Sequence, residues 1–166
     1  MMKKSFATVL VLLAVAGSAQ AFHLDEFRNG MSKEKVREVL AGWKFDRIQD
    51  FSDTTIIAYD QPEKRTFRQY TFTFCNDKLV ALQHELKPSL RNFIITSNNY
   101  IASNGQPMKV DTNSSVISTG EKSSIALFWR ASGEVVGIKY SILPSEEELA
   151  IVYEVPNSCF NIPRPQ

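Results

Sequence analysis

The stretch YTFTFCNDKLVALQHEL, residues 70–86, has the clearest local pattern in the chain. Its first half alternates Tyr70, Phe72 and Phe74 with Thr and Cys, and its second half alternates aliphatic with polar residues after Asn76-Asp77. Successive side chains of a strand point to opposite faces, so this alternation predicts a β-hairpin with one aromatic, buried face. The pattern therefore favours an antiparallel sheet.

A short helix is expected before this hairpin, at residues 33–40. Ser32 is placed to cap it, because a serine hydroxyl accepts hydrogen bonds from the free N–H groups of a first turn. Gly42 provides a natural stop, because glycine readily adopts the left-handed conformation. The apolar residues of the helix recur at helical spacing: Val36, Val39 and Leu40.

A second helix is expected to begin at Pro88-Ser89 and to end at Asn104-Gly105. The remaining strand-like segments are residues 45–51, 54–59, 108–117, 124–130, 135–142 and 149–155. The order of elements is thus helix, four strands, helix, four strands.

This order predicts an α+β fold, with an antiparallel sheet and both helices on one face. The two helix starts, Ser32 and Ser89, lie 57 positions apart, which indicates a tandem helix-plus-four-strand repeat over residues 27–86 and 87–155. The alternative is a chance match, since short strands separated by turns resemble one another.

The first 21 residues have the three parts of a secretory signal peptide. Lys3 and Lys4 form the positive start, an apolar run covers residues 6–15, and Ala19-Gln20-Ala21 fits the small-x-small cleavage rule. Cleavage after Ala21 predicts a periplasmic or secreted protein. An uncleaved membrane anchor is the alternative, but the run is shorter than the about 20 residues that span a bilayer. We therefore expect no stable membrane insertion.

Removal of the signal peptide leaves 145 residues, the usual length of one domain, in which residues 156–166 form a C-terminal tail. The remaining chain has 17 basic and 18 acidic residues. This balance gives no reason to expect a nucleic-acid partner.

The chain has two cysteines, Cys75 and Cys159, 84 positions apart. An even count outside the cytoplasm favours one disulfide, and two buried free thiols are the alternative. Two cysteines and two distant histidines, His23 and His84, do not form a ligand set, so we expect no metal site.

The sequence has no recognisable catalytic motif, phosphate-binding loop or dinucleotide fingerprint. Cys75 with His84 as its base would be a nucleophile pair, but Cys159 is the simpler partner for Cys75. His84 shares a strand face with apolar residues, which favours a structural role. We expect no enzyme, no catalytic residue and no cofactor.

Aromatic side chains on an open sheet face are common anchors for a partner protein. We take Trp43, Trp129 and Tyr140 as the candidate partner-binding residues. Leu127 and Trp129 would point opposite to Phe128, so large side chains are expected on both faces of that strand. The sequence leaves open which face of the sheet is exposed.

The segment Gly30-Met31-Ser32-Lys33-Glu34-Lys35-Val36, continued through Leu40-Ala41-Gly42 and followed by an aromatic hairpin, resembles the exported module of the BamE-like (SmpA/OmlA) and β-lactamase-inhibitory-protein-like superfamily. There a Gly-Met/Leu-Ser/Thr opening caps the helix and Leu-Gly ends it; here the ending is one residue longer. The resemblance implies a binding module without catalytic activity. Two departures are plain: no lipid-attachment cysteine follows the signal peptide, and the cysteines are fewer than in the inhibitory protein.

The leading hypothesis is an exported, non-catalytic protein-interaction module of the envelope-assembly or inhibitor type, with an unidentified protein partner. A small-ligand or peptide carrier is one alternative, and an enclosed apolar cavity would distinguish it. An enzyme without a recognisable motif is the other, and it would require a deep pocket with convergent polar side chains. The sequence predicts no oligomeric state.

Overall fold

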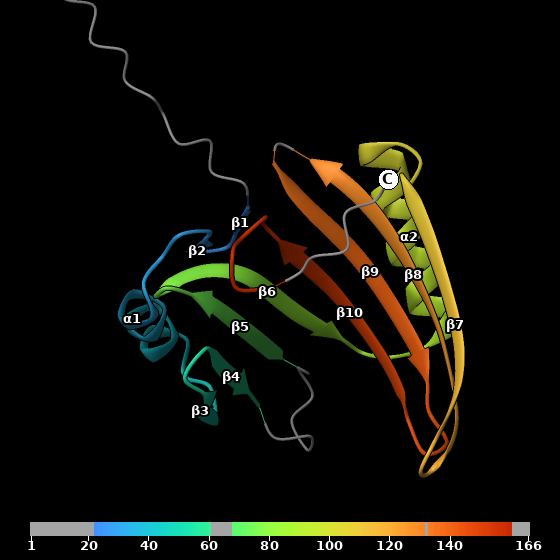
Figure 1. Cartoon of the computed structure of the whole chain (residues 1–166), viewed down its shortest axis with the longest axis horizontal. Coiled ribbons are helices and arrows are strands. Elements are labelled where there is room, and N and C mark those ends of the chain that lie inside the picture. Colours follow the sequence, from blue (N-terminus) through green and yellow to red (C-terminus); the bar gives the residue numbers. More distant parts are fainter. Residues whose placement is uncertain (1–21, 61–67, 132, 161–166) are drawn as a thin grey trace, which may run out of the picture.

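The computed structural model describes residues 22–60, 68–131 and 133–160. The predicted signal peptide and the last six residues of the tail lie outside this part. Eight of the described strands form one antiparallel sheet, in the order β3-β4-β5-β6-β10-β9-β8-β7 (Figure 1). Their bounds are β3 Arg47–Ser52, β4 Thr55–Tyr59, β5 Gln69–Cys75, β6 Lys78–Leu86, β7 Lys109–Ile117, β8 Gly120–Ala131, β9 Glu134–Ile142 and β10 Glu147–Glu154. The short strands β1 (His23–Leu24) and β2 (Phe27–Arg28) pair with each other.

The chain has a mainly-β fold, so the expected α+β class with tandem helix-plus-four-strand units is wrong. Of the described residues, 52% lie in strands and 20% in helices. The segments 27–86 and 87–155 share one continuous sheet, because β6 and β10 pair from Leu86↔Leu149 to Ala81↔Glu154. Strand content was underestimated where polar residues extend a strand: the segment expected at 124–130 is a strand of 12 residues.

Each helix begins at the serine expected from the sequence. Before α1 (Lys33–Trp43), the Ser32 hydroxyl accepts a hydrogen bond from the backbone N–H of Lys35 at 3.2 Å. Before α2 (Leu90–Asn104), the Ser89 hydroxyl accepts from the N–H of Asn92 at 3.1 Å. These bonds satisfy N–H groups that have no partner within the helix.

The helix ends differ in how well the sequence predicted them. Gly105 ends α2 as expected, with a positive φ of 79° and its N–H bonded to the carbonyl of Ile101 at 2.8 Å. Gly42 does not end α1, and Lys44 takes the left-handed conformation instead, at φ 53°. The extra turn brings Trp43 against Phe27, with ring centroids 5.0 Å apart. This packing favours continuation of the helix past the glycine.

Both helices pack on the same face of the sheet, which we call the helix face. The register aligns residues of neighbouring strands on that face: Phe72, Leu82, Tyr153, Val136 and Trp129. The first core cluster packs Val36 and Leu40 of α1 onto Phe72 and its neighbours. The second packs Phe93 of α2 onto Ile138 and Tyr140. The opposite face of the sheet is left without a described helix.

Cys75 and Cys159 lie at disulfide distance, as the sequence predicted, with their Cα atoms 5.6 Å apart. The pair connects the end of β5 to the segment after β10. Among the described residues no cysteine is free. Cys75 is therefore no candidate nucleophile.

Candidate functional site: the uncovered face of the sheet

The candidate site is the face of the sheet that no described helix covers, which we call the uncovered face. Its residues alternate along each strand with those of the helix face, so their side chains point the other way. Five of them follow one line across neighbouring strands: Thr71, Gln83, Val152, Gly137 and Phe128. The register of the strand pairing therefore brings together residues that are distant in the sequence.

The centre of the uncovered face is apolar and closely packed. Ala150 is only 7% exposed and Val152 only 4%, although no described helix covers them. Phe128 contributes to this packing because its ring leans over Gly137: a Cβ atom at Gly137 would lie 3.1 Å from Phe128 Cε1. A glycine in a strand often marks such a close approach. Gly137 thus leaves room for a large, half-buried aromatic ring on this face.

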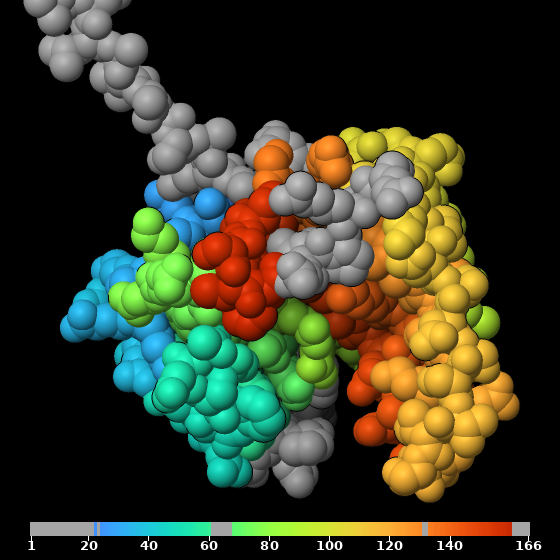
Figure 2. All heavy atoms as spheres, in the orientation of Figure 1, coloured from blue at the N-terminus to red at the C-terminus, as the bar shows by residue number. Residues whose placement is uncertain are grey.

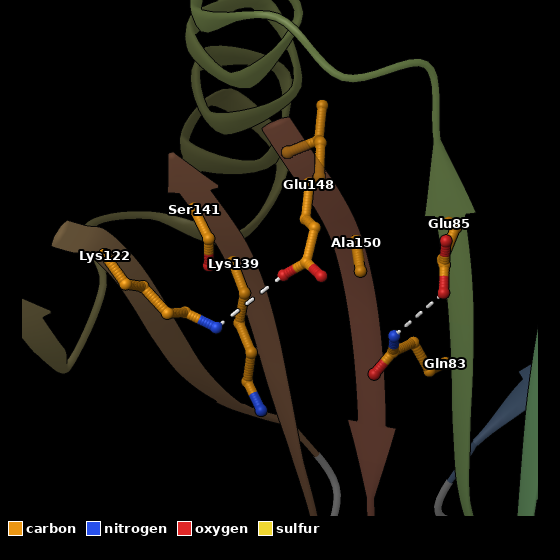
Figure 3. Close-up of a pocket in the computed structure, with 8 residues that line it drawn as sticks. Gln83, Glu85, Lys122, Lys139, Ser141, Glu148 and Ala150 are labelled. Carbon is orange, nitrogen blue, oxygen red and sulfur yellow. Dashed lines mark hydrogen bonds and ion pairs between the residues drawn. The ribbon is translucent and has the colours of Figure 1, made fainter. Parts of the chain in front are cut away.

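A partly open groove with charged walls lies beside this centre (Figure 3). Its volume is about 230 Å³, and the space-filling view shows a hollow between the green part of the surface, in the colour range of β5 and β6, and the orange-red part, in the colour range of β9 and β10 (Figure 2). Residues from β6, β8, β9 and β10 line it: Gln83, Glu85, Lys122, Lys139, Ser141, Glu148, Leu149 and Ala150. The groove therefore crosses the junction of the first and last parts of the chain.

The charged groups of the groove differ in how they are held. Lys122 Nζ lies 3.8 Å from Glu148 Oε2, an exposed pair of the kind that contributes little stability. Glu85 accepts hydrogen bonds from Gln69 Nε2 at 2.7 Å and from Gln83 Nε2 at 3.4 Å. Lys139 makes no ion pair with a described residue. Its ammonium group is available to an acidic group of a partner.

Burial raises the pKa of the Glu85 carboxyl above its usual range, and the nearby Glu148 and Glu146 act in the same direction. The hydrogen bonds from Gln69 and Gln83 oppose this shift. A partner cation placed beside Glu85 would favour its charged form, so binding there is expected to lower its pKa.

The three aromatic residues singled out from the sequence pack in the two core clusters between the helices and the sheet. Trp129 is 3% exposed and Tyr140 is 4% exposed, both in the cluster beneath α2. Trp129 Nε1 donates to the carbonyl of Gly105 at 2.9 Å, and Phe93 stacks on Tyr140. Trp43, the last residue of α1, is half-buried against the first core cluster. The fold does not bring these three side chains together on an accessible surface.

Sequence reasoning missed the residues that form the uncovered face, above all Phe128, Lys139 and Glu85. A signal for this face was present in β9, where small and polar residues alternate with large apolar ones. Gly137, Lys139 and Ser141 occupy one face of that strand, and the apolar residues between them occupy the other.

His84 has a structural environment. Its ring stacks on that of Tyr70 with centroids 4.5 Å apart, on the helix face. Burial lowers its pKa, which favours the neutral imidazole. In the described ranges, no group of three or more His, Cys, Asp or Glu side chains could hold a metal ion.

These features define a mainly-β protein with one helix-covered and one uncovered sheet face. Comparison with protein-family models, with curated proteins and with solved structures gave no match to this chain. Within residues 22–60, 68–131 and 133–160, no helix has the length and apolar character needed to cross a membrane.

Proposed function

We propose that this chain is an exported, non-catalytic binding module whose uncovered sheet face binds a folded protein partner. The observation that carries the proposal is the arrangement of Phe128 over Gly137, beside a groove with charged residues of both signs. An apolar centre surrounded by a polar rim is typical of protein–protein interfaces, and aromatic residues are enriched in their centres.

The shape of the groove favours a protein partner over a small ligand. Small-molecule sites are enclosed, mostly apolar and about 300–1,000 Å³ in volume. This groove is smaller, only partly open, and lined by two lysines and two glutamates. A protein surface with charges of both signs would match it better than a carried lipid.

Export is part of the proposal. Its support is the N-terminal sequence together with the Cys75–Cys159 pair, because disulfides persist in oxidising compartments. Phe22, the first residue after the expected cleavage point, is buried and its ring lies 6.2 Å from that of Tyr153. N-terminal sequencing of the exported protein should therefore begin at Phe22, and a species that retains residues 1–21 would contradict export with cleavage.

The relation to the BamE-like and inhibitory-protein-like superfamily also remains a proposal. It rests on the capped helix at residues 30–42 and the aromatic hairpin that follows. The proposed relation predicts that the uncovered face binds a partner protein. It also predicts that the partner's covalent structure stays unchanged.

Substitutions on the two faces of the molecule test the proposed function. Phe128→Ala and Lys139→Glu should each reduce recovery of the partner complex from envelope extract at least tenfold, because interface centres carry most of the binding energy. Ile95→Ala is the matched control, since Ile95 is an exposed apolar residue on the far side of α2. Equal recovery with all three variants, at equal stability, would exclude the uncovered face as the binding site.

A further inference from the structure

Strand β7 is one edge of the eight-stranded sheet, and its backbone is open to pairing. Its nine residues keep an uninterrupted register with β8, from Lys109↔Phe128 to Ile117↔Gly120. No described strand lies on its other side, and residues 110–114 are all exposed. A long, regular edge strand is a template for a further strand.

The other edge strand, β3, is protected in ways that β7 is not. It has six residues and a register shift between Asp50 and Ser52. Asp50 also forms ion pairs with Lys33 and Arg37 of α1. Bulges and charges of this kind prevent edge-to-edge pairing. On β7 the charges are confined to Lys109 and Asp111, which pair with each other at 2.8 Å, and residues 112–117 are uncharged.

The backbone groups that β7 directs outward follow from its hairpin with β8. The hairpin closes on the pair Ile117↔Gly120 around two turn residues, so these two residues bond to each other. Hydrogen-bonded and non-hydrogen-bonded positions alternate along an antiparallel ladder. The odd-numbered residues of β7 therefore direct their backbone N–H and C=O groups toward β8. The even-numbered residues 110–116 direct theirs away from the sheet.

We propose that two copies of this chain pair through β7, antiparallel, about a two-fold axis at Asn113. This register uses all nine residues and joins only outward-facing groups, with Thr112 bonded to Ser114 of the second copy. It places Asp111 opposite Ser115 and Lys109 opposite Ile117, so no like charges face each other. A contact of this kind is self-complementary and closed.

The same register covers two exposed apolar side chains. Val110 is 53% exposed and Val116 is 87% exposed, the highest value among the exposed large apolar side chains of the described residues. Both lie on the helix face of β7, and the two-fold axis places Val110 of one copy beside Val116 of the other, twice in the dimer. The sequence of β7 is thus nearly symmetric about Asn113.

The dimer would present two binding sites to one side. Two strands that pair antiparallel and share a face are related by an axis perpendicular to the sheet, so the uncovered faces of both copies point the same way. If each uncovered face binds a partner, as proposed above, the dimer is bivalent and gains avidity for clustered partners. The pairing itself does not depend on that function.

A cysteine on the axis tests the register. In the dimer, Asn113 of one copy lies opposite Asn113 of the other at a non-hydrogen-bonded position, where Cα atoms lie about 4.5 Å apart. The Asn113→Cys variant should therefore form a disulfide-linked dimer on oxidation. Ser115→Cys is the matched control, because the two copies of residue 115 are four positions out of register. Rapid crosslinking of the first variant alone supports the pairing. Equal crosslinking of both variants, or of neither, overturns it.

The mass of the full chain over a concentration series supplies the second measurement. Sedimentation should show a monomer–dimer equilibrium. Val116→Lys should raise the dissociation constant of the dimer at least about tenfold, since the change occurs twice per dimer. Ile95→Lys on α2 should leave the Kd unchanged. A chain that stays monomeric at every concentration overturns the proposal, while the tests of Phe128 and Lys139 remain independent of this result.

Discussion

Removal of the Cys75–Cys159 pair should strongly destabilise the fold. The cysteines lie 84 positions apart, so the bond closes a loop that contains most of the sheet and α2. The chain-entropy model gives a loop of this length about 4–5 kcal/mol at 25 °C, through restriction of the unfolded chain. The native tail keeps other contacts, since the N–H of Val155 donates to the carbonyl of Val80 at 2.9 Å. Loss of the bond therefore acts mainly on the unfolded state.

The double variant Cys75→Ala/Cys159→Ala tests this reasoning in urea, with tryptophan fluorescence as the signal. At a typical slope of about 2 kcal/mol/M, the unfolding midpoint should fall by about 2 M. Reduction of the unmodified protein should give a similar fall. Ser158→Ala is the control, because Ser158 neighbours the pair without belonging to it. A loss below about 1 kcal/mol in the double variant would refute the loop argument.

Three further predictions concern buried charge, pH and the uncovered face. Arg68→Ala should cost about 1–3 kcal/mol in urea unfolding, because it removes the two-point partner of the fully buried Asp60 carboxylate, and Arg68→Lys should cost less. Burial raises the pKa of Glu134 to about 7. Between about pH 4.5 and 7 the unfolded chain has lost this proton while the folded chain keeps it, so the free energy of unfolding should fall as the pH rises through this range. Glu134→Gln should remove that part of the pH dependence of unfolding. Gly137→Ala should displace the ring of Phe128 by a few tenths of an ångström and weaken partner binding measured by calorimetry.

The local features of the fold were predictable from the sequence. Ser32 and Ser89 cap the helices because their hydroxyls satisfy nearby N–H groups, a contact set by residues three positions apart. The alternation in residues 70–86 predicted β5 and β6, because it too is a local pattern. The predicted end of α1 was wrong, because the end depends on a distant contact, the packing of Trp43 against Phe27.

The fold class was wrong because it depends on long-range pairing. The junction of β6 and β10 joins residues more than 60 positions apart, and no local pattern encodes it. Strand β7 was found, but its polar residues gave little sign that it forms the edge of a single large sheet.

The candidate site was not predictable because it requires knowledge of which face the helices cover. Trp129 and Tyr140 are large aromatics of the kind that bind partners, yet α2 packs on them. Lys139 and Glu85 converge on one groove only through the register of three strands. The alternation in β9 separates the two faces but does not say which one is open.

The measurement that tests the central claim most directly is site-specific photo-crosslinking in cells that produce the protein. A photoreactive residue at Ser141, within the groove, should give a discrete crosslinked protein of defined mass. The same residue at Asn99, exposed on α2, should give none. Lys139→Glu should abolish the Ser141 product. Crosslinks from Asn99 alone, or a Ser141 product unaffected by Lys139→Glu, would contradict binding through the uncovered face.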